Sequence, residues 1–246
     1  MWELKMMKKI EETENQIVFI ADISETLANS IRRYTNQVLV MAVDEVEISR
    51  NDSPLYDEAV THRIGLIPLK TEKSVNEKST GKLKLAVNKE GLVYSGSLKG
   101  NLDVVYEKIP ITTLSEDQEL QLVAFVKAGK GSEHSKFSPG LMFFRNVSEI
   151  TLDKEFSEEI KKTFPESEIK EKGNKILVLD NKKREILDFC EGLAVKKNKK
   201  AEVETKDELV ITIESFGQMS PENMFKKSIE VLKKDLASVQ KNIEKI

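Results

Sequence analysis

The last part of the chain carries an apolar pattern that restricts the possible folds more than any other segment. Ser220 and Pro221 form the N-cap and first-turn proline that begin many helices. Large apolar side chains then recur at alternating spacings of four and three, at Phe225, Ile229, Leu232, Leu236, Val239, Ile243 and Ile246. This heptad pattern predicts a long helix with one apolar face.

That apolar face needs a cover, because each large apolar side chain left in water forfeits roughly 1.5–3 kcal/mol. The cover can be the chain's own core or a second chain, and heptads alone do not distinguish the two. A helix of roughly six turns is longer than a small domain is wide. We therefore expect part of the face to meet another polypeptide.

The N-terminal part predicts a strand, a helix and a second strand. Residues 16–21 are apolar on both faces of a strand, so we expect this strand to be buried on both sides. Ser24 is a suitable N-cap for a following helix. The apolar face of this helix repeats at spacings of four, three and four, at Leu27, Ile31, Tyr34 and Val38. A second strand is expected at residues 41–48.

The middle of the chain has a different residue pattern. Between residues 51 and 150, turn signals separate short stretches rich in Val, Leu, Tyr and Phe. Three of these stretches are residues 82–87, 102–106 and 119–127. The pattern predicts a mostly β insertion.

Residues 151–204 change character again. Phe156, Ile160 and Phe164 share one face of a predicted helix that Pro165 ends. A strand is expected at residues 175–179 and a second helix at residues 183–193. These elements predict a small α/β module.

Composition excludes several classes of function. A formal net charge of −3 argues against broad nucleic-acid binding, and we expect no direct specific DNA binding. The basic cluster at Lys196, Lys197, Lys199 and Lys200 is short and isolated, and it is typical of a solvated turn.

The expected location is the cytoplasm. The single cysteine, Cys190, fits a reducing compartment. The longest apolar run, residues 38–43, is too short to cross a bilayer, so no membrane partner is expected. The N-terminus lacks the apolar core of a signal peptide.

No catalytic or metal motif emerges from the sequence. Gly129-Lys130-Gly131-Ser132 departs from the phosphate-binding loop, which needs lysine directly before serine or threonine. The two histidines, His62 and His134, show no metal-ligand spacing and are expected to make structural hydrogen bonds. The acidic pairs Asp44-Glu45 and Asp57-Glu58 lack the alternating aspartates of a polymerase metal loop, so we expect no catalytic residues.

Three separated blocks carry a family resemblance. Residues 29–70 contain NSIRR at 29–33, AVDEV at 42–46 and HRIGLIPL at 62–69. Residues 129–139, GKGSEHSKFSP, are similar to the element G-x-G-x-x-H-A-K-W-x-P, with Ser135 and Phe137 in place of the usual Ala and Trp. Residues 213–222, IESFGQMSPE, match the junction before a C-terminal dimerisation helix.

These blocks resemble the family that contains the D subunit of the archaeal DNA-directed RNA polymerase. The same family includes the eukaryotic third-largest subunit and the N-terminal domain of the bacterial α subunit. The resemblance implies an α+β fold with a discontinuous dimerisation domain at 1–50 and 205–246. A mostly β insert domain would occupy residues 51–150, and a degenerate ferredoxin-like module residues 151–204.

The family also implies a role and partners. The role is that of a non-catalytic scaffold in transcription, which forms a heterodimer with subunit L. This pair is the platform for small subunits N and P and for the two large catalytic subunits. The apolar residues named above, from Leu27 to Val38 and from Phe225 to Ile243, would form the dimer interface.

The resemblance further assigns a role to an arginine pair. Arg32 and Arg33 would contact a large subunit, a task that suits the planar fork of a guanidinium group. Without the resemblance, both are ordinary exposed helix arginines.

The expected cofactors are none. Many D subunits hold a [4Fe–4S] cluster through four cysteine thiolates in the ferredoxin-like module, whereas this chain has only Cys190. Phe164-Pro165 and Asp188-Phe189 lie near the expected cysteine positions. The zinc-binding cysteines of the eukaryotic counterpart are also missing from residues 88–100, so neither an Fe–S cluster nor zinc is expected.

Two other interpretations stay open at this point. A bacterial-like α-type homodimer is a scaffold as well, but the ferredoxin-like insertion and the missing DNA-binding C-terminal domain disfavour it. A small enzyme or electron carrier derived from the ferredoxin-like module would need redox cysteines or a nucleophile paired with a base, and neither is recognisable.

Overall fold

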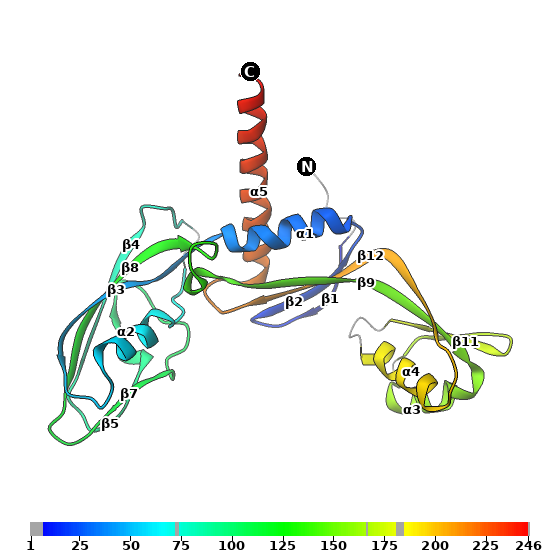
Figure 1. Cartoon of the computed structure of the whole chain (residues 1–246), viewed down its shortest axis with the longest axis horizontal. Coiled ribbons are helices and arrows are strands. Elements are labelled where there is room, and N and C mark those ends of the chain that lie inside the picture. The colour runs from blue at the N-terminus through cyan, green and yellow to red at the C-terminus, as the bar shows by residue number, and fades with distance from the viewer. Residues whose placement is uncertain (1–6, 72–73, 166, 181–184, 246) are drawn as a thin grey trace. The chain divides into compact units, whose positions relative to one another are not determined.

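The computed structural model describes residues 7–71, 74–165, 167–180 and 185–245 (Figure 1). Contacts divide the chain into two units, each made of three segments. The first contains Met1–Glu12, Val18–Ala28 and Phe143–Thr212. The second contains Thr13–Ile17, Asn29–Met142 and Ile213–Ile246.

The largest sheet has six strands in the order β1-β2-β12-β9-β11-β10. Its strands are β1 (Met7–Glu12), β2 (Gln16–Ala21), β9 (Gly140–Asp153), β10 (Ile169–Lys172), β11 (Lys175–Leu179) and β12 (Glu202–Ser215). Strand β2 has the predicted bounds, and its residues from Ile17 to Ala21 are all buried. Burial on both faces of β2 is therefore confirmed, and the N-terminal strand lies beside C-terminal β12.

The first unit contains the small module at the far ends of β9 and β12. In chain order it contains the short 3₁₀ helix η4 (Lys154–Phe156), helix α3 (Ser157–Thr163), the antiparallel pair β10 and β11, and helix α4 (Glu185–Lys196). The helix predicted before Pro165 is α3, and the second predicted helix is α4. The start predicted for the second helix, Lys183, lies outside the described residues.

The core of this module is built on one large cluster of apolar side chains and a thiol. Its buried residues come from β9, η4, α3, β11 and α4 and are Ile150, Leu152, Phe156, Ile160, Ile176, Val178, Ile186, Leu187, Cys190, Leu193 and Ala194. The rings of Phe164 and Phe189 pack against this core and meet edge to face, with centroids 5.4 Å apart. Such a core lets a small module bury apolar surface without a bound group.

The second unit contains the β insertion. Its four-stranded antiparallel sheet has the order β3-β8-β4-β6, formed by β3 (Leu39–Asn51), β8 (Leu120–Lys130), β4 (Thr80–Val87) and β6 (Lys99–Gly100). A two-stranded ribbon joins β5 (Gly91–Tyr94) to β7 (Pro110–Leu114), and the 3₁₀ helix η2 (Ser95–Ser97) follows β5. The expected β character of the insertion is confirmed.

A helix that the sequence analysis missed lies within this insertion. Helix α2 (Asp57–Gly65) packs on β3 and buries Val60 and Ile64. Arg63 Nη1 donates a hydrogen bond to the carbonyl of Ile111, at 2.6 Å, which ties the helix to β7. The helix was missed because only two of its nine residues are buried, too few to show an apolar period.

Residues 102–106, one of the apolar stretches on which the prediction of a β insertion rests, do not form a strand. The segment makes only an isolated bridge between Leu69 and Val104. Val105 N also donates to the carbonyl of Pro68 at 2.9 Å. The segment is a loop that contributes Val104 to the insertion's core.

The block at residues 129–139 starts at the end of β8 and continues into a turn at residues 131–133. The ring of Phe137 lies so close to Gly129 that a side chain there would meet it at 2.7 Å. His134 Nδ1 accepts a hydrogen bond from the backbone N of Lys136 at 3.1 Å, so its predicted structural role is confirmed. The block includes the 3₁₀ helix η3 (Ser135–Phe137).

The fold therefore mixes sheets with a few separate helices, as the α+β prediction requires. The two units group the residues differently from the three predicted domains, because β9 and β12 contribute residues to both units. Among the described residues, no helix has both the length and the apolar character that crossing a membrane requires.

Candidate subunit interface

The C-terminal helix α5 (Pro221–Ile243) begins at a well-formed cap. The hydroxyl of Ser220 accepts a hydrogen bond from the backbone N of Asn223 at 3.3 Å, and Pro221 takes the first helical position. The first two turns are anchored in this chain, because Met224 and Ser228 are fully buried and Phe225 is 8% exposed. We call Pro221–Ser228 the root of α5.

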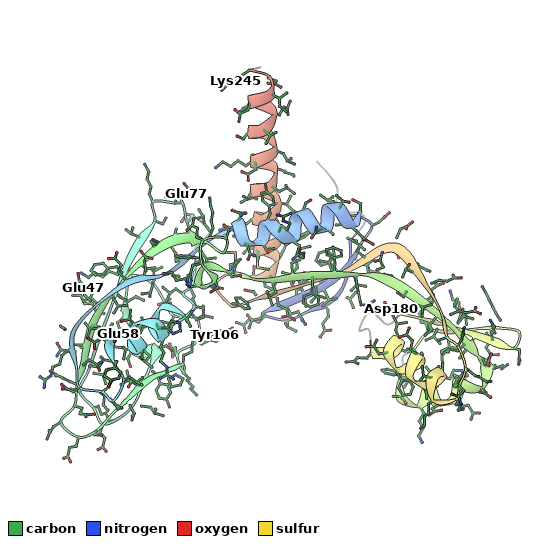
Figure 2. All side chains as sticks on the ribbon, viewed as in Figure 1. Glu47, Glu58, Glu77, Tyr106, Asp180 and Lys245 are labelled. Atoms are coloured by element: carbon green, nitrogen blue, oxygen red, sulfur yellow. The ribbon has the colours of Figure 1, made fainter. Side chains whose placement is uncertain are left out.

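The second half of the helix has a different environment. Its three large apolar side chains are exposed, Leu236 by 59%, Val239 by 54% and Ile243 by 65%. They follow one another at heptad spacing and so share one face of the helix. At 1.5 Å per residue, the 23 residues of α5 span about 34 Å. We call Leu236, Val239 and Ile243 the tip face; Lys245, labelled in Figure 2, lies just beyond it.

The middle of α5 is held by the end of an N-terminal helix. Helix α1 (Glu25–Tyr34) starts after Ser24, whose hydroxyl accepts a hydrogen bond from Leu27 N at 3.3 Å. At its other end, Tyr34 Oη donates to Asp235 Oδ2 at 3.1 Å. That hydrogen bond is the main reason why the pKa of Tyr34 is raised. The 3₁₀ helix η1 (Thr35–Gln37) also packs on α5.

The predicted interface residues thus fall into two groups. Three of them are buried in this chain and offer little surface to another: Ile31 (5% exposed), Val38 (1%) and Phe225 (8%). Three others, Tyr34, Ile229 and Leu232, are half-buried. The exposed ones are Leu27 and the tip face. The apolar pattern therefore combines the helix's own anchorage with a face that stays open.

The arginine pair lies exposed in the last turn of α1. Arg32 folds back along its own helix, where Nη2 and Nε donate to Asn29 Oδ1 at 2.8 and 3.2 Å. This contact holds the Arg32 guanidinium in one orientation on the surface. Its other N–H groups remain available as donors, since a guanidinium carries five.

The acidic pairs singled out in the sequence form no catalytic constellation. Asp44 is held by Lys127 Nζ at 2.9 Å and Lys136 Nζ at 3.1 Å. Burial alone would raise the pKa of Asp44, but the hydrogen bonds from these lysines outweigh it and lower the pKa. Within the described ranges, no three His, Cys, Asp or Glu side chains gather closely enough to hold a metal ion.

The single thiol is also unsuited to ligation. Cys190 is fully buried in the module's core. Burial, with a smaller effect of Glu191, raises its pKa to about 12. A metal ligand must be a thiolate, and one thiolate is far from the four that a [4Fe–4S] cluster needs. The donor set does not fit the cluster.

Two lysines of the basic cluster at the end of α4 make local contacts. Lys199 Nζ lies 2.6 Å from Asp153 and 2.9 Å from Glu155. Lys197 Nζ lies 4.8 Å from the centre of the Phe156 ring. These contacts, made by two of the four lysines, agree with a surface turn.

One residue of the α5 anchorage was not identified from the sequence. Asp235 is a charged residue next to Leu236 in the helix, and an exposed carboxylate is common at such a position. Its partner Tyr34 lies 201 residues away in the chain. No sequence pattern links two residues at that separation, so only the tertiary structure reveals the pair.

Comparison with known proteins agrees with this architecture. The family model described as "RNA polymerase Rpb3/RpoA insert domain" matches residues 46–157. A protein named "DNA-directed RNA polymerase subunit Rpo3" from Archaeoglobus fulgidus is 30% identical over 258 residues, which cover 96% of this chain and 97% of the relative. A protein of the same name from Pyrobaculum calidifontis is 30% identical over 251 residues and 93% of each chain.

A third relative aligns over a shorter stretch. The protein named "DNA-directed RNA polymerase subunit Rpo3" from Pyrococcus horikoshii is 36% identical over 169 residues. The aligned part covers 64% of this chain and 64% of that relative, which is less than two thirds of its length. The full-length matches and the insert-domain match together show that the chain belongs to the Rpo3 family of archaeal DNA-directed RNA polymerase subunits.

Proposed function

We propose that this chain is a non-catalytic assembly subunit of an archaeal DNA-directed RNA polymerase. In this role it pairs with a second small subunit, subunit L, through the tip face of α5. The observation that carries the proposal is the contrast along one helix, whose root is buried while Leu236, Val239 and Ile243 are exposed. An anchored helix with an open apolar face suits docking against a partner helix.

The energetics of the tip face favour a protein partner. Covering a large apolar side chain contributes roughly 1.5–3 kcal/mol when it moves from water to a packed interface. The tip face has three such side chains on a helix that is already ordered, so binding loses little conformational entropy. In protein interfaces a few residues that become fully buried near the centre carry most of the free energy of association.

The test is co-expression of the full chain with a candidate L subunit, followed by a pull-down. Leu236→Asp places a charge in the middle of the tip face, and burying it without a partner costs several kcal/mol. We expect this variant to lose the L subunit. The matched control is Lys241→Asp, which changes an exposed residue two positions from Val239, about 200° round the helix.

The outcome separates the rival arrangements. Normal pairing of Leu236→Asp with the L subunit would contradict the proposal. The bacterial-like alternative predicts that the lone chain forms a stable dimer with itself, which a mass measurement in solution detects. No separate observation on this chain favours that alternative.

Further partners and the location follow from the same proposal. The pair of small subunits would be the platform for subunits N and P and for the two large catalytic subunits. Arg32 and Arg33, exposed at the end of α1, are the proposed contacts to a large subunit. A subunit of an archaeal polymerase works beside the DNA in the cytoplasm.

The chain is also proposed to contain neither an Fe–S cluster nor zinc. The support comes from the single, buried and protonated thiol of Cys190 and from the apolar core around it. Metal analysis of the purified full chain tests this proposal directly. Iron or zinc at a stoichiometric level would contradict it.

A further inference from the structure

The outer face of the four-stranded sheet carries an unusual arrangement of lysines. Along β4, Leu83 and Leu85 point into the insertion's core while Lys82 and Lys84 are exposed. On the neighbouring strand β6, Lys99 lies directly opposite Lys84 in the register. Three lysine side chains therefore lie on the same face at one edge of the sheet.

This arrangement costs stability in the isolated chain. Like charges directly opposite each other on neighbouring strands are destabilising. Lys127, on β8, has its charge compensated by Asp44 at 2.9 Å. Within the described part of the chain, Lys82, Lys84 and Lys99 have no such acidic partner. A local conflict that folding does not require is typical of a surface with a function.

A groove runs beside these lysines. Phe125 and Val126 contribute its apolar part, and Lys82, Asn101, Asp44 and Glu45 lie around it. The ring of Phe125 is half-buried, and Lys82 Nζ lies 4.8 Å from its centre. The groove thus combines an aromatic surface with donors on one side and carboxylates on the other.

The charges on this face are separated by strand. Lysines occupy β4 and β6, whereas β3 presents Glu45 and Glu47, the latter labelled in Figure 2. In the register, Glu45 lies opposite Phe125, which lies opposite Lys82. One row of neighbouring side chains across the sheet therefore consists of an acidic residue, an aromatic residue and a basic residue.

We propose that this face docks an acidic polypeptide segment of another protein. Its carboxylates would lie over Lys82, Lys84 and Lys99, and an apolar residue would lie on Phe125 in the groove. Charge complementarity selects this partner, since opposite potentials steer association and fix the orientation. A nucleic acid fits less well, because the exposed carboxylates of Glu45 and Glu47 on β3 would repel a continuous row of phosphates.

The experiment measures binding of a fluorescein-labelled peptide to the full chain by fluorescence anisotropy. The peptide has a run of glutamates, one central phenylalanine and a C-terminal lysine. We expect binding that weakens at high salt, because exposed charges are screened. The double variant Lys84→Glu with Lys99→Glu is expected to bind about tenfold more weakly. Lys170→Glu with Lys172→Glu, which changes two exposed lysines on strand β10, is the matched control.

A single variant guards against loss of fold. Lys84→Glu turns the like-charged pair with Lys99 into an opposite pair, so its melting temperature is expected to equal or exceed that of the unchanged chain. Weaker binding by this stable variant supports the proposal. A lower melting temperature would assign the lysine a structural role and overturn it.

Three further results would also overturn the proposal. These are no binding by the unchanged chain, equal loss of binding in the control, and tighter binding of a single-stranded oligonucleotide through the same lysines. The assay does not involve the tip face of α5, so its failure leaves the proposed pairing with subunit L untouched.

Discussion

The contrast between the root and the tip of α5 gives the sharpest test of the structure. Met224→Ala and Leu236→Ala remove apolar atoms from the same helix, and alanine suits a helix at both places. Met224 is fully buried, so its truncation leaves a cavity and is expected to lower the free energy of unfolding by about 2–5 kcal/mol. The isolated full chain is the sample.

At the tip the same kind of change should cost much less. Leu236 is 59% exposed, so less than half of its side chain is shielded in this chain. Full burial of a leucine contributes roughly 1.5–3 kcal/mol, so we expect a loss of about 1 kcal/mol or less. No cavity forms, because water already reaches the site.

Urea denaturation followed by circular dichroism measures both variants, at two protein concentrations that reveal self-association. An effect of Leu236→Ala as large as that of Met224→Ala, independent of concentration, would mean that the tip face packs on this chain itself. The proposed pairing would then be untenable, because it needs an open face. With the L subunit present, the same substitution should weaken the complex.

Three other expectations concern single residues. Burial raises the pKa of Cys190 from 9.0 to about 12, so between these pH values the folded chain keeps a proton that the unfolded chain loses. The contribution of this thiol to the stability of the fold therefore falls as pH rises from about 9 to about 12. The thiol of the folded chain should also resist alkylation, whereas unfolding should permit it. Gly217→Ala should destabilise the chain by roughly 1–3 kcal/mol in thermal denaturation. The φ angle of Gly217 is +93°, and the added Cβ would lie 2.4 Å from Val105 Cγ1. Adding Val105→Ala should restore part of the lost stability. Tyr34→Phe removes the hydrogen bond to Asp235 at a partly exposed site, so it should lower the free energy of unfolding by about 0.5 kcal/mol. It should also speed amide hydrogen exchange in the middle of α5. Unchanged exchange there would show that this hydrogen bond does not hold the helix.

Elements with a strong apolar period were predicted closely from the sequence. The strand at residues 16–21, the strand at residues 175–179 and the start of α5 at Pro221 agree with the structure. Each of these segments either buries a regular apolar pattern or carries a specific cap, and such signals are local.

Elements whose form depends on distant contacts were predicted poorly. Helix α2 buries only Val60 and Ile64, so its pattern is weak. Residues 102–106 are rich in apolar side chains but form a loop, in which only an isolated bridge joins Val104 to Leu69. In both places long-range packing, which local propensity does not encode, sets the conformation.

Spacing and residue identity were enough to predict the long apolar C-terminal helix and the family, and the composition contains a single cysteine. Which part of that helix is free could be learned only from the folded chain. The heptad pattern is the same along the whole helix, yet Phe225 is covered by this chain and Leu236 is not. Burial depends on the neighbours that the fold brings to each turn, and Tyr34, bonded to Asp235 from 201 residues away, is one of those neighbours.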